Sequence, residues 1–212
     1  MSDPTASFGA TEAIVGASGG RPPTGGSDLA HHDAAEYALL GLLREGPCHG
    51  YRLAAAFAPD GHLGPILRLK MSQMYAYLHK LERLGWLMPR DESAVGAPPA
   101  APARPRRVFA LTLDGERAFD RWLAEPVAAT RDIRLDFLLK LAFAIERDRA
   151  FAAALVARQR TASAARLERL RAQVAATRDD PLSLRRLALG HRISQTEATL
   201  TWLDELAGDL RG

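Results

Sequence analysis

Residues 71–88 combine an apolar helix face with a face made of groups that bind nucleic acid. Met74, Leu78, Leu81 and Leu84 recur at intervals of four or three, which predicts the buried side of a helix. The opposite side has no acidic residue and consists of Ser72, Gln73, Ala76, Tyr77, Lys80 and Arg83. Hydroxyl, amide and cationic groups on one exposed face suit contacts to phosphates and base edges in a DNA groove. The segment favours a DNA-reading helix over an ordinary surface helix, and Ser72 is its expected N-cap.

The basic residues of the chain concentrate around this helix. The whole sequence has a net charge of +3, whereas residues 66–107 hold eight Lys or Arg against three Asp or Glu, a local +5. Such a local positive field favours binding to a phosphate backbone. Arginines beyond the helix are expected to follow phosphates or enter a minor groove. The predicted DNA contacts are Ser72, Gln73, Tyr75, Tyr77, Lys80, Arg104, Arg106 and Arg107.

The neighbouring segments predict the elements that hold this helix. Apolar stripes predict helices over residues 34–45, with Asp33 as N-cap, and over residues 49–58. Residues 86–92 and 106–111 predict two strands, and the loop between them, residues 93–105, contains four Pro and five Ala. Thr112 is the expected N-cap of a fourth helix that ends near residue 124. This order predicts a winged helix-turn-helix domain over residues 34–126.

Residues 127–212 predict a helical C-terminal domain, with helices near 132–146, 148–178 and 182–209. The last helix has a seven-residue apolar repeat, which is typical of a seam between helices. We expect this seam to join two chains, because DNA readers commonly match palindromic sites with a two-fold dimer. An intramolecular core is the alternative. The predicted dimerisation residues are Leu182, Leu189, Ile193, Leu200 and Leu203. The expected fold is therefore mainly α with a small β-hairpin.

The remaining features exclude several classes of protein. Residues 1–33 are rich in Gly, Ser, Thr, Pro and Ala and predict a disordered tail. The single cysteine, Cys48, cannot form an internal disulfide, and no segment has the apolar length of a membrane span or the pattern of a signal peptide, so we expect a cytoplasmic protein. No catalytic triad, phosphate-binding loop or ordered metal spacing is present, and His31-His32-Asp33 lacks a spaced partner. We expect no enzyme, cofactor or metal.

Several motifs resemble the PadR family of transcriptional regulators over residues 34–210. Leu39-Leu-Gly-Leu-Leu and Gly46-Pro-Cys-His-Gly-Tyr resemble its first two helices, and Ser72 through Gly85-Trp86-Leu resembles its recognition helix. Arg106-Arg-Val-Phe-Ala-Leu-Thr-Leu-Asp-Gly-Glu resembles its second wing strand and fourth helix. Asp136-Phe-Leu-Leu-Lys-Leu-Ala-Phe and Thr201-Trp-Leu-Asp-Glu-Leu resemble the longer subgroup that is similar to virulence-gene activators.

The resemblance implies a homodimeric regulator that binds double-stranded DNA, usually as a repressor released by a small-molecule effector. The sequence departs from the family in its first 33 residues and in the wing tip, residues 96–102, which is longer and richer in Ala and Pro. A winged helix used for protein–protein contact, without specific DNA binding, is the alternative.

Overall fold

The structure is a computed structural model that describes residues 34–90 and 107–211. The predictions for the N-terminal tail, including Asp33 as an N-cap, lie outside the described residues. The same holds for the wing tip and for Arg104 and Arg106.

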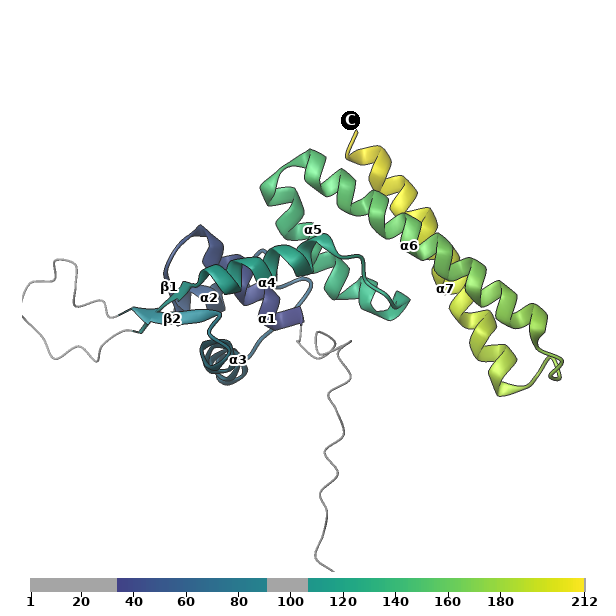
Figure 1. Cartoon of the computed structure of the whole chain (residues 1–212), viewed down its shortest axis with the longest axis horizontal. Coiled ribbons are helices and arrows are strands. Elements are labelled where there is room, and N and C mark those ends of the chain that lie inside the picture. The colour runs from purple at the N-terminus through teal and green to yellow at the C-terminus, as the bar shows by residue number, and fades with distance from the viewer. Residues whose placement is uncertain (1–33, 91–106, 212) are drawn as a thin grey trace, which may run out of the picture. The chain divides into compact units, whose positions relative to one another are not determined.

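The N-terminal part of the described chain places helices around a small antiparallel sheet (Figure 1). The helices are α1 (Ala34–Leu42), extended by the 3-10 turn η1 (Leu43–Glu45), then α2 (Gly50–Ala56) and α3 (Met71–Arg83). The strands are β1 (Cys48–His49), β2 (Leu87–Arg90) and β3 (Val108–Leu111), in the order β1-β3-β2. This arrangement confirms the predicted winged helix-turn-helix. The strand β1 was not predicted, because two residues are too short to show a periodic pattern.

Gly85 and Thr112 define the end of α3 and the start of the helix that follows β3. Gly85 has a φ of 72°, a left-handed conformation that favours glycine, and it ends the turn after α3. The Thr112 hydroxyl donates to the Gly85 carbonyl at 2.7 Å and accepts from the backbone N–H of Gly115 at 3.1 Å. Thr112 is thus the N-cap of α4 (Leu113–Ala124), as predicted. The prediction for Ser72 is wrong, since the extended residue before α3 is Lys70.

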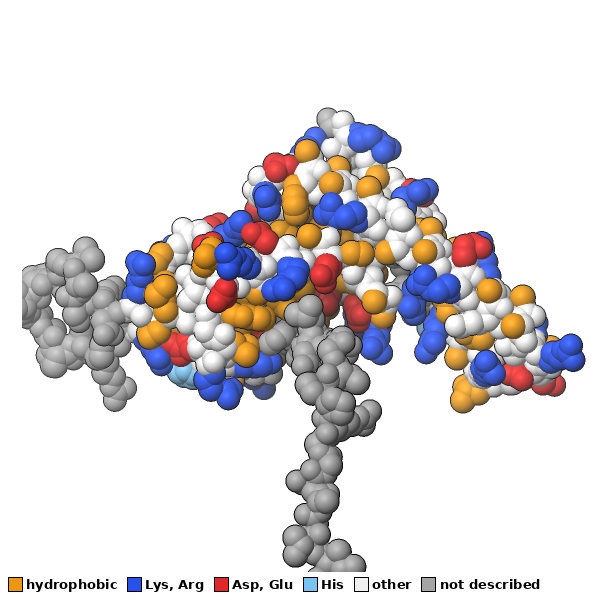
Figure 2. Space-filling view, in the orientation of Figure 1, with side chains coloured by type: hydrophobic (Ala, Val, Ile, Leu, Met, Phe, Trp, Pro, Cys, Tyr) orange, Lys and Arg blue, Asp and Glu red, His pale blue; other side chains and the backbone are white. Residues whose placement is uncertain are grey.

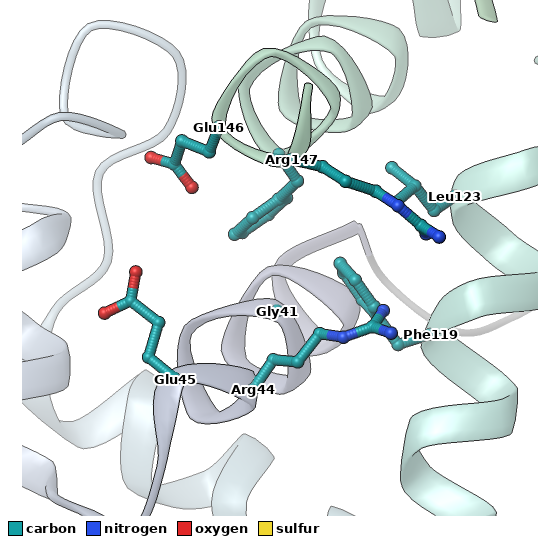
Figure 3. Close-up of a pocket in the computed structure, with 8 residues that line it drawn as sticks. Gly41, Arg44, Glu45, Phe119, Leu123, Glu146 and Arg147 are labelled. Carbon is teal, nitrogen blue, oxygen red and sulfur yellow. The ribbon is translucent and has the colours of Figure 1, made fainter. Parts of the chain in front are cut away.

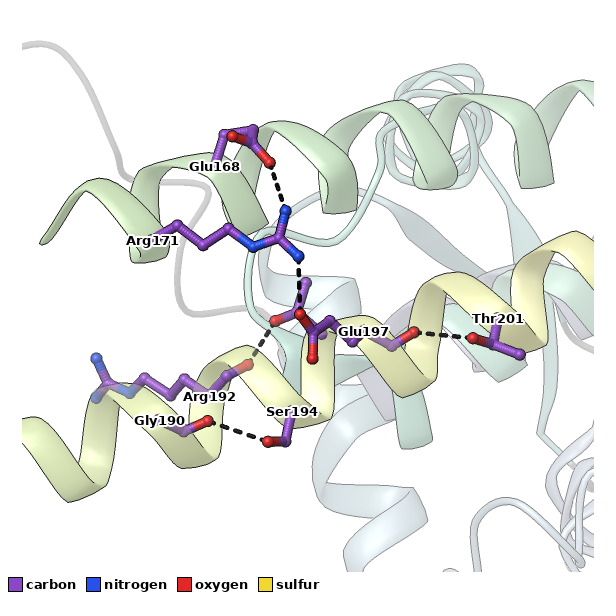
Figure 4. A network of polar contacts seen from close by, with 8 residues as sticks. Glu168, Arg171, Gly190, Arg192, Ser194, Glu197 and Thr201 are labelled. Carbon is purple, nitrogen blue, oxygen red and sulfur yellow. Dashed lines mark hydrogen bonds and ion pairs between the residues drawn. The ribbon is translucent and has the colours of Figure 1, made fainter. Parts of the chain in front are cut away.

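The C-terminal part is helical and contains η3 (Thr130–Arg134), α5 (Asp136–Arg147), α6 (Arg149–Ala176) and α7 (Leu184–Asp209). The helices α6 and α7 pack side by side as a hairpin (Figure 1). Figure 4 shows Arg171 of α6 donating to Glu168 of its own helix at 3.0 Å and to Glu197 of α7 at 2.9 Å. The hydrogen bonds to Glu197 and Glu168 raise the pKa of Arg171. Within the described residues, none of the helices has the length and apolar character needed to cross a membrane.

Helix α5 contributes to two hydrophobic cores. Leu139 and Phe143 join the core of the winged helix, where α1, α3 and α4 also meet. Phe137, Leu141 and Ala144 join a second core with α6 and α7. These two sets lie on different faces of one helix, so the orientation of α5 is fixed from both sides. The predicted domain boundary at residue 126 falls between α4 and η3, and the next α-helix, α5, serves both parts.

Buried polar groups hold the segment that joins α4 to η3. The side chain of Gln159 on α6 accepts from the backbone N–H of Val127 at 2.7 Å and donates to the Val127 carbonyl at 3.2 Å. The ammonium of Lys140 on α5 donates to the Glu125 carbonyl at 2.7 Å and lies 5.0 Å from the centre of the Trp122 ring. Burial lowers the pKa of Lys140. Side chains of α5 and α6 thus form hydrogen bonds with the backbone of the segment that follows α4.

Candidate nucleic-acid interface

Helix α3 buries three of the four residues of its predicted apolar side, whereas the fourth, Leu84, follows the helix and is 44% exposed. Met74, Leu78 and Leu81 are each at most 1% exposed. Ser72 and Gln73 on the other side are exposed, and Tyr77 is half-buried against the edge of the core. The outward face is therefore fixed by core packing, and it is the face with hydroxyl and amide groups.

A hydrogen bond holds the Gln73 side-chain amide in the first turn of α3. The Gln73 amide oxygen accepts from the backbone N–H of Lys70 at 3.1 Å. This contact leaves the amide nitrogen of Gln73 as a donor. Ser72 lies in the same turn and is exposed. Exposed donors at a helix N-terminus suit an anionic partner such as a phosphate.

Tyr75 has a packing role that the sequence shows only in part. Its ring lies 6.5 Å from the Phe109 ring of β3. A Cβ added at Gly50 would lie 2.6 Å from the Tyr75 hydroxyl oxygen. Tyr75 therefore packs closely over the start of α2, and a side chain at Gly50 would displace the Tyr75 ring from this position. The side chain is still 38% exposed, so a part of it faces solvent.

The charge of Lys80 is used inside the protein. Its ammonium donates to the Glu36 carboxylate at 2.7 Å, and Glu36 on α1 is only 1% exposed. A buried carboxylate near a helix N-terminus needs a compensating cation, which Lys80 supplies. This placement differs from the prediction of a DNA-facing Lys80. The reason is that its partner lies 44 residues away in the sequence and 2.7 Å away in the fold.

Arg107 also has an internal partner. Its guanidinium lies 2.8 Å from the Glu82 carboxylate of α3 and 5.7 Å from the centre of the Phe109 ring. Glu82 in turn contacts the imidazole of His79 at 3.1 Å. Arg107 thus ties the wing strand β3 to α3, and its side chain remains 45% exposed. Its charge is shared with Glu82 and is weaker toward an outside partner.

A different set of cations is left for an outside partner. Within residues 34–90 and 107–211, the charged groups of four exposed residues next to or on α3 and β2 have no ion-pair partner; these residues are Arg68, Lys70, Arg83 and Arg90. Lys70 precedes the first residue of α3 and Arg83 is its last. Figure 2 shows Lys and Arg side chains gathered over the position of α3. Sequence reasoning counted these residues in the local charge but did not select them, because their lack of partners depends on the fold.

The predicted dimerisation residues do not share one environment. Leu189 and Leu203 are 6% and 0% exposed within the single chain, and Ile193 and Leu200 are half-buried. Leu182 is 80% exposed and lies before the start of α7. The seam thus packs largely within the protomer, which differs from the expectation that Leu189 and Leu203 face a second chain. The α6 helix supplies the partner surface that the sequence pattern left open.

A second group of leucines is exposed instead. Leu182, Leu184 and Leu187 are 80%, 82% and 52% exposed. They lie at the start of α7, next to the turn between α6 and α7. These three large apolar side chains are close in sequence and exposed. Exposed apolar surface of this kind often marks contact with another molecule. We call Leu182, Leu184 and Leu187 the leucine patch.

Neither a metal site nor an activated thiol stands out among the described residues. Within those residues, no group of three or more His, Cys, Asp or Glu side chains could hold a metal ion. Burial raises the pKa of the Cys48 thiol, which disfavours the reactive thiolate.

Comparison with known proteins places both parts of the chain in described families. Residues 39–121 match the Transcriptional regulator PadR-like family, and residues 133–211 match the family described as Virulence activator alpha C-term. The negative transcriptional regulator PadR of Bacillus subtilis is 29% identical over a match that covers 51% of this chain and 55% of that protein. The probable transcriptional regulator Rv1176c of Mycobacterium tuberculosis is 28% identical, and the match covers 84% of this chain and 98% of that protein.

A solved structure is similar along most of the chain. The crystal structure of Bacillus subtilis PadR in complex with operator DNA is 24% identical, covers 84% of this chain and 99% of its own, and has a TM-score of 0.40. The two family matches fall on the winged helix and on the C-terminal helices respectively. The winged helix therefore matches the PadR-like domain of transcriptional regulators, and the C-terminal helices match the virulence-activator-type C-terminal domain.

Proposed function

We propose that this protein is a sequence-specific DNA-binding repressor that acts as a homodimer and responds to a small molecule. The observation that carries the DNA-binding proposal is the set of four exposed cations around the acid-free face of α3 that have no ion-pair partner in the described part of the chain. Lys70 and Arg83 flank a helix of 13 residues, which is about 20 Å long. This spacing suits contacts to phosphates on the two sides of a groove.

The proposed contacts divide by chemistry. Arg68, Lys70, Arg83 and Arg90 hold the phosphate backbone, together with Arg104 and Arg106, which precede β3 in the sequence and lie outside the described residues. Ser72 and Gln73 reach base edges from the first turn of α3, where Gln73 retains a donor nitrogen. Tyr75 and Tyr77 supply hydroxyl contacts at the edge of the helix. Lys80 and Arg107 act chiefly by holding α3 in place, because each already pairs with a carboxylate.

The homodimer is proposed from the requirement of a two-fold site and from the leucine patch. A dimer presents two α3 helices to two half-sites. The free energies by which the two helices discriminate between sequences then add. Since Leu189 and Leu203 are buried in the protomer, the exposed Leu182, Leu184 and Leu187 are the better candidates for contact with the second chain. The repressor role is proposed because the relative from Bacillus subtilis is named a negative transcriptional regulator.

Fluorescence anisotropy with the DNA upstream of the protein's own gene tests this function. We expect binding that weakens steeply with salt, because each phosphate contact releases counterions. Arg83→Ala should lower the affinity for all sequences and reduce the salt slope by about one. Arg117→Ala is the matched control, since Arg117 lies on α4, is exposed and pairs with Asp114 of its own helix. Equal affinity of the two variants would exclude this face as the binding site.

A further inference from the structure

A pocket lies where the winged helix meets α5, and its floor is aromatic. It has a volume of about 320 Å³ and is lined by residues of α1, η1, α4 and α5: Gly41, Arg44, Glu45, Phe119, Leu123, Phe143, Glu146 and Arg147. The Phe119 and Phe143 rings meet edge to face at 5.3 Å. A Cβ at Gly41 would lie 2.6 Å from Phe143 and 2.8 Å from Phe119, so glycine lets both rings rest against α1. A pocket of this size holds a small organic molecule.

The cationic wall of the pocket is already neutralised in part. Both guanidinium groups bind one carboxylate: Arg44 is hydrogen-bonded to Asp120, and the Arg147 guanidinium lies 3.7 Å from the same Asp120. Arg44 also lies over the Phe119 ring at 5.7 Å, and Arg147 over the Phe151 ring at 4.5 Å. The two arginines therefore have partners within the protein, and their planar groups are held in place.

The opposite wall carries two carboxylates, which have few partners among the described residues. Figure 3 shows the carboxylates of Glu45, from η1, and Glu146, from the end of α5, pointing toward the same space. Among the residues that the structure describes, Glu45 has no ion-pair or hydrogen-bond partner, and Glu146 has only His62 at 3.8 Å. Arg44, Arg147, Glu45, Glu146 and the adjacent Asp120 together carry a formal charge of −1, from two cations and three carboxylates.

We propose that this pocket binds an organic cation, a molecule with an apolar or aromatic body and a primary ammonium group. The ammonium donates to Glu45 and Glu146, as charge-assisted hydrogen bonds to a carboxylate are the strong ones. The apolar body lies on Phe119, Phe143 and Leu123. Because Glu45 belongs to the winged helix and Glu146 to α5, the ligand bridges the two parts of the protein. An effect of this bridging on DNA binding rests on the proposed function, whereas binding of the cation itself does not.

Isothermal titration calorimetry on the full chain without DNA tests the proposal with two probes of similar shape. The 2-phenylethylammonium cation should bind, and the 3-phenylpropanoate anion should bind at least about tenfold more weakly, a difference of about 1.4 kcal/mol. The double variant Glu45→Gln with Glu146→Gln should lose about tenfold or more in affinity for the cation. The double variant Glu116→Gln with Glu205→Gln, which removes two exposed carboxylates elsewhere, should keep it.

Three outcomes would overturn the proposal. The first is no binding of the cation at millimolar concentration. The second is anion binding as tight as cation binding, which would assign the pocket to the arginine wall. The third is unchanged cation affinity in the Glu45→Gln and Glu146→Gln variant. None of these results depends on DNA binding, so a failure here leaves the DNA-binding test above intact.

Discussion

At the scale of residues, the cations around α3 fall into two groups that sequence cannot separate. Lys80 and Arg83 lie three positions apart on one helix and have the same charge. Lys80 pairs with the buried Glu36, whereas Arg83 is exposed and has no ion-pair partner among the described residues. The first side chain therefore serves the stability of the fold, and the second is free for a partner molecule.

A pair of variants separates these roles. Lys80→Ala should lower the free energy of unfolding by about 1–3 kcal/mol, because it removes a charge partner of a buried carboxylate. Arg83→Ala should change that free energy by less than about 0.5 kcal/mol, since its charge has no partner to lose. Urea denaturation of the two variants measures both values. Adding Glu36→Gln to Lys80→Ala should recover part of the loss, and a double variant that is fully additive would contradict the pairing.

The contact between Gly50 and Tyr75 gives a second prediction at this scale. Gly50→Ala places a Cβ 2.6 Å from the Tyr75 hydroxyl oxygen and 2.8 Å from its Cζ. We expect a loss of up to about 1 kcal/mol in the free energy of unfolding, less than for an overpacked core, because the partly exposed Tyr75 ring can shift. Tyr75→Ala in the same chain removes the clash, so the Gly50→Ala substitution should cost much less there. Thermal denaturation of the four proteins measures this coupling, and equal costs in both backgrounds would refute the contact.

At the scale of elements, α5 is the part that joins the winged helix to the C-terminal helices. It packs into both cores, and its buried Lys140, which is 3% exposed, donates to the carbonyl of Glu125, the residue that follows α4. The Trp122 indole of α4 also donates to Asp136 at the start of α5 at 3.0 Å. A movement of α5 would therefore reach the winged helix through direct contacts.

Buried Lys140 predicts a pH dependence of stability. Burial lowers its pKa in the folded protein below the unfolded value of about 10.4. Between these two pKa values the unfolded chain binds a proton that the folded protein does not, so stability rises with pH in this window. Above about pH 10 the pKa of Tyr37, raised by burial, has the opposite effect.

The measurement is urea denaturation of the wild type and of Lys140→Met at several alkaline pH values below about 10. Lys140→Met keeps the apolar part of the side chain and removes the titrating group. Cys48, whose pKa is raised by burial, is present in both proteins, so the difference between the two curves reports Lys140. Stability should rise more with pH in the wild-type protein than in the variant. Parallel curves for the two proteins would show that Lys140 does not titrate in the way that its burial indicates.

At the scale of the whole molecule, the leucines of the α6–α7 hairpin divide between the protomer and the proposed dimer. Leu187→Asp alters a side chain that is 52% exposed, and Leu189→Asp alters one that is 6% exposed. The first should shift the protein toward the monomer with little change in the melting temperature of the protomer. The second should destabilise the fold by about 3 kcal/mol or more, because it buries a charge in an apolar contact.

Light scattering coupled to size exclusion, together with thermal denaturation, separates the two outcomes. A dimer that persists unchanged in Leu187→Asp would exclude the leucine patch as the interface. A Leu189→Asp variant that melts like the wild type would show that α7 packs against α6 less closely than its burial indicates.

The sequence by itself determined the elements and the face of α3 that turns outward. Local signals act within a few residues, so the apolar period of α3, the turn at Gly85 and the cap at Thr112 could be recognised without the fold. The same local logic failed for Ser72, because α3 already begins at Met71 after Lys70, a residue type that the capping preferences do not favour. It also missed β1, which exists only because β3 lies beside it.

Only the tertiary structure decided which charges are free and which apolar surfaces are covered. Chain segments that are distant in sequence place three pairs of side chains close together: Lys80 with Glu36, Arg107 with Glu82, and Glu45 with Glu146. A seven-residue repeat states that α7 has an apolar seam, but it does not state whether α6 or a second chain covers that seam. Contacts between distant segments pair some charges and cover some apolar surfaces. The charges and surfaces that remain exposed can bind a ligand, DNA or another protomer.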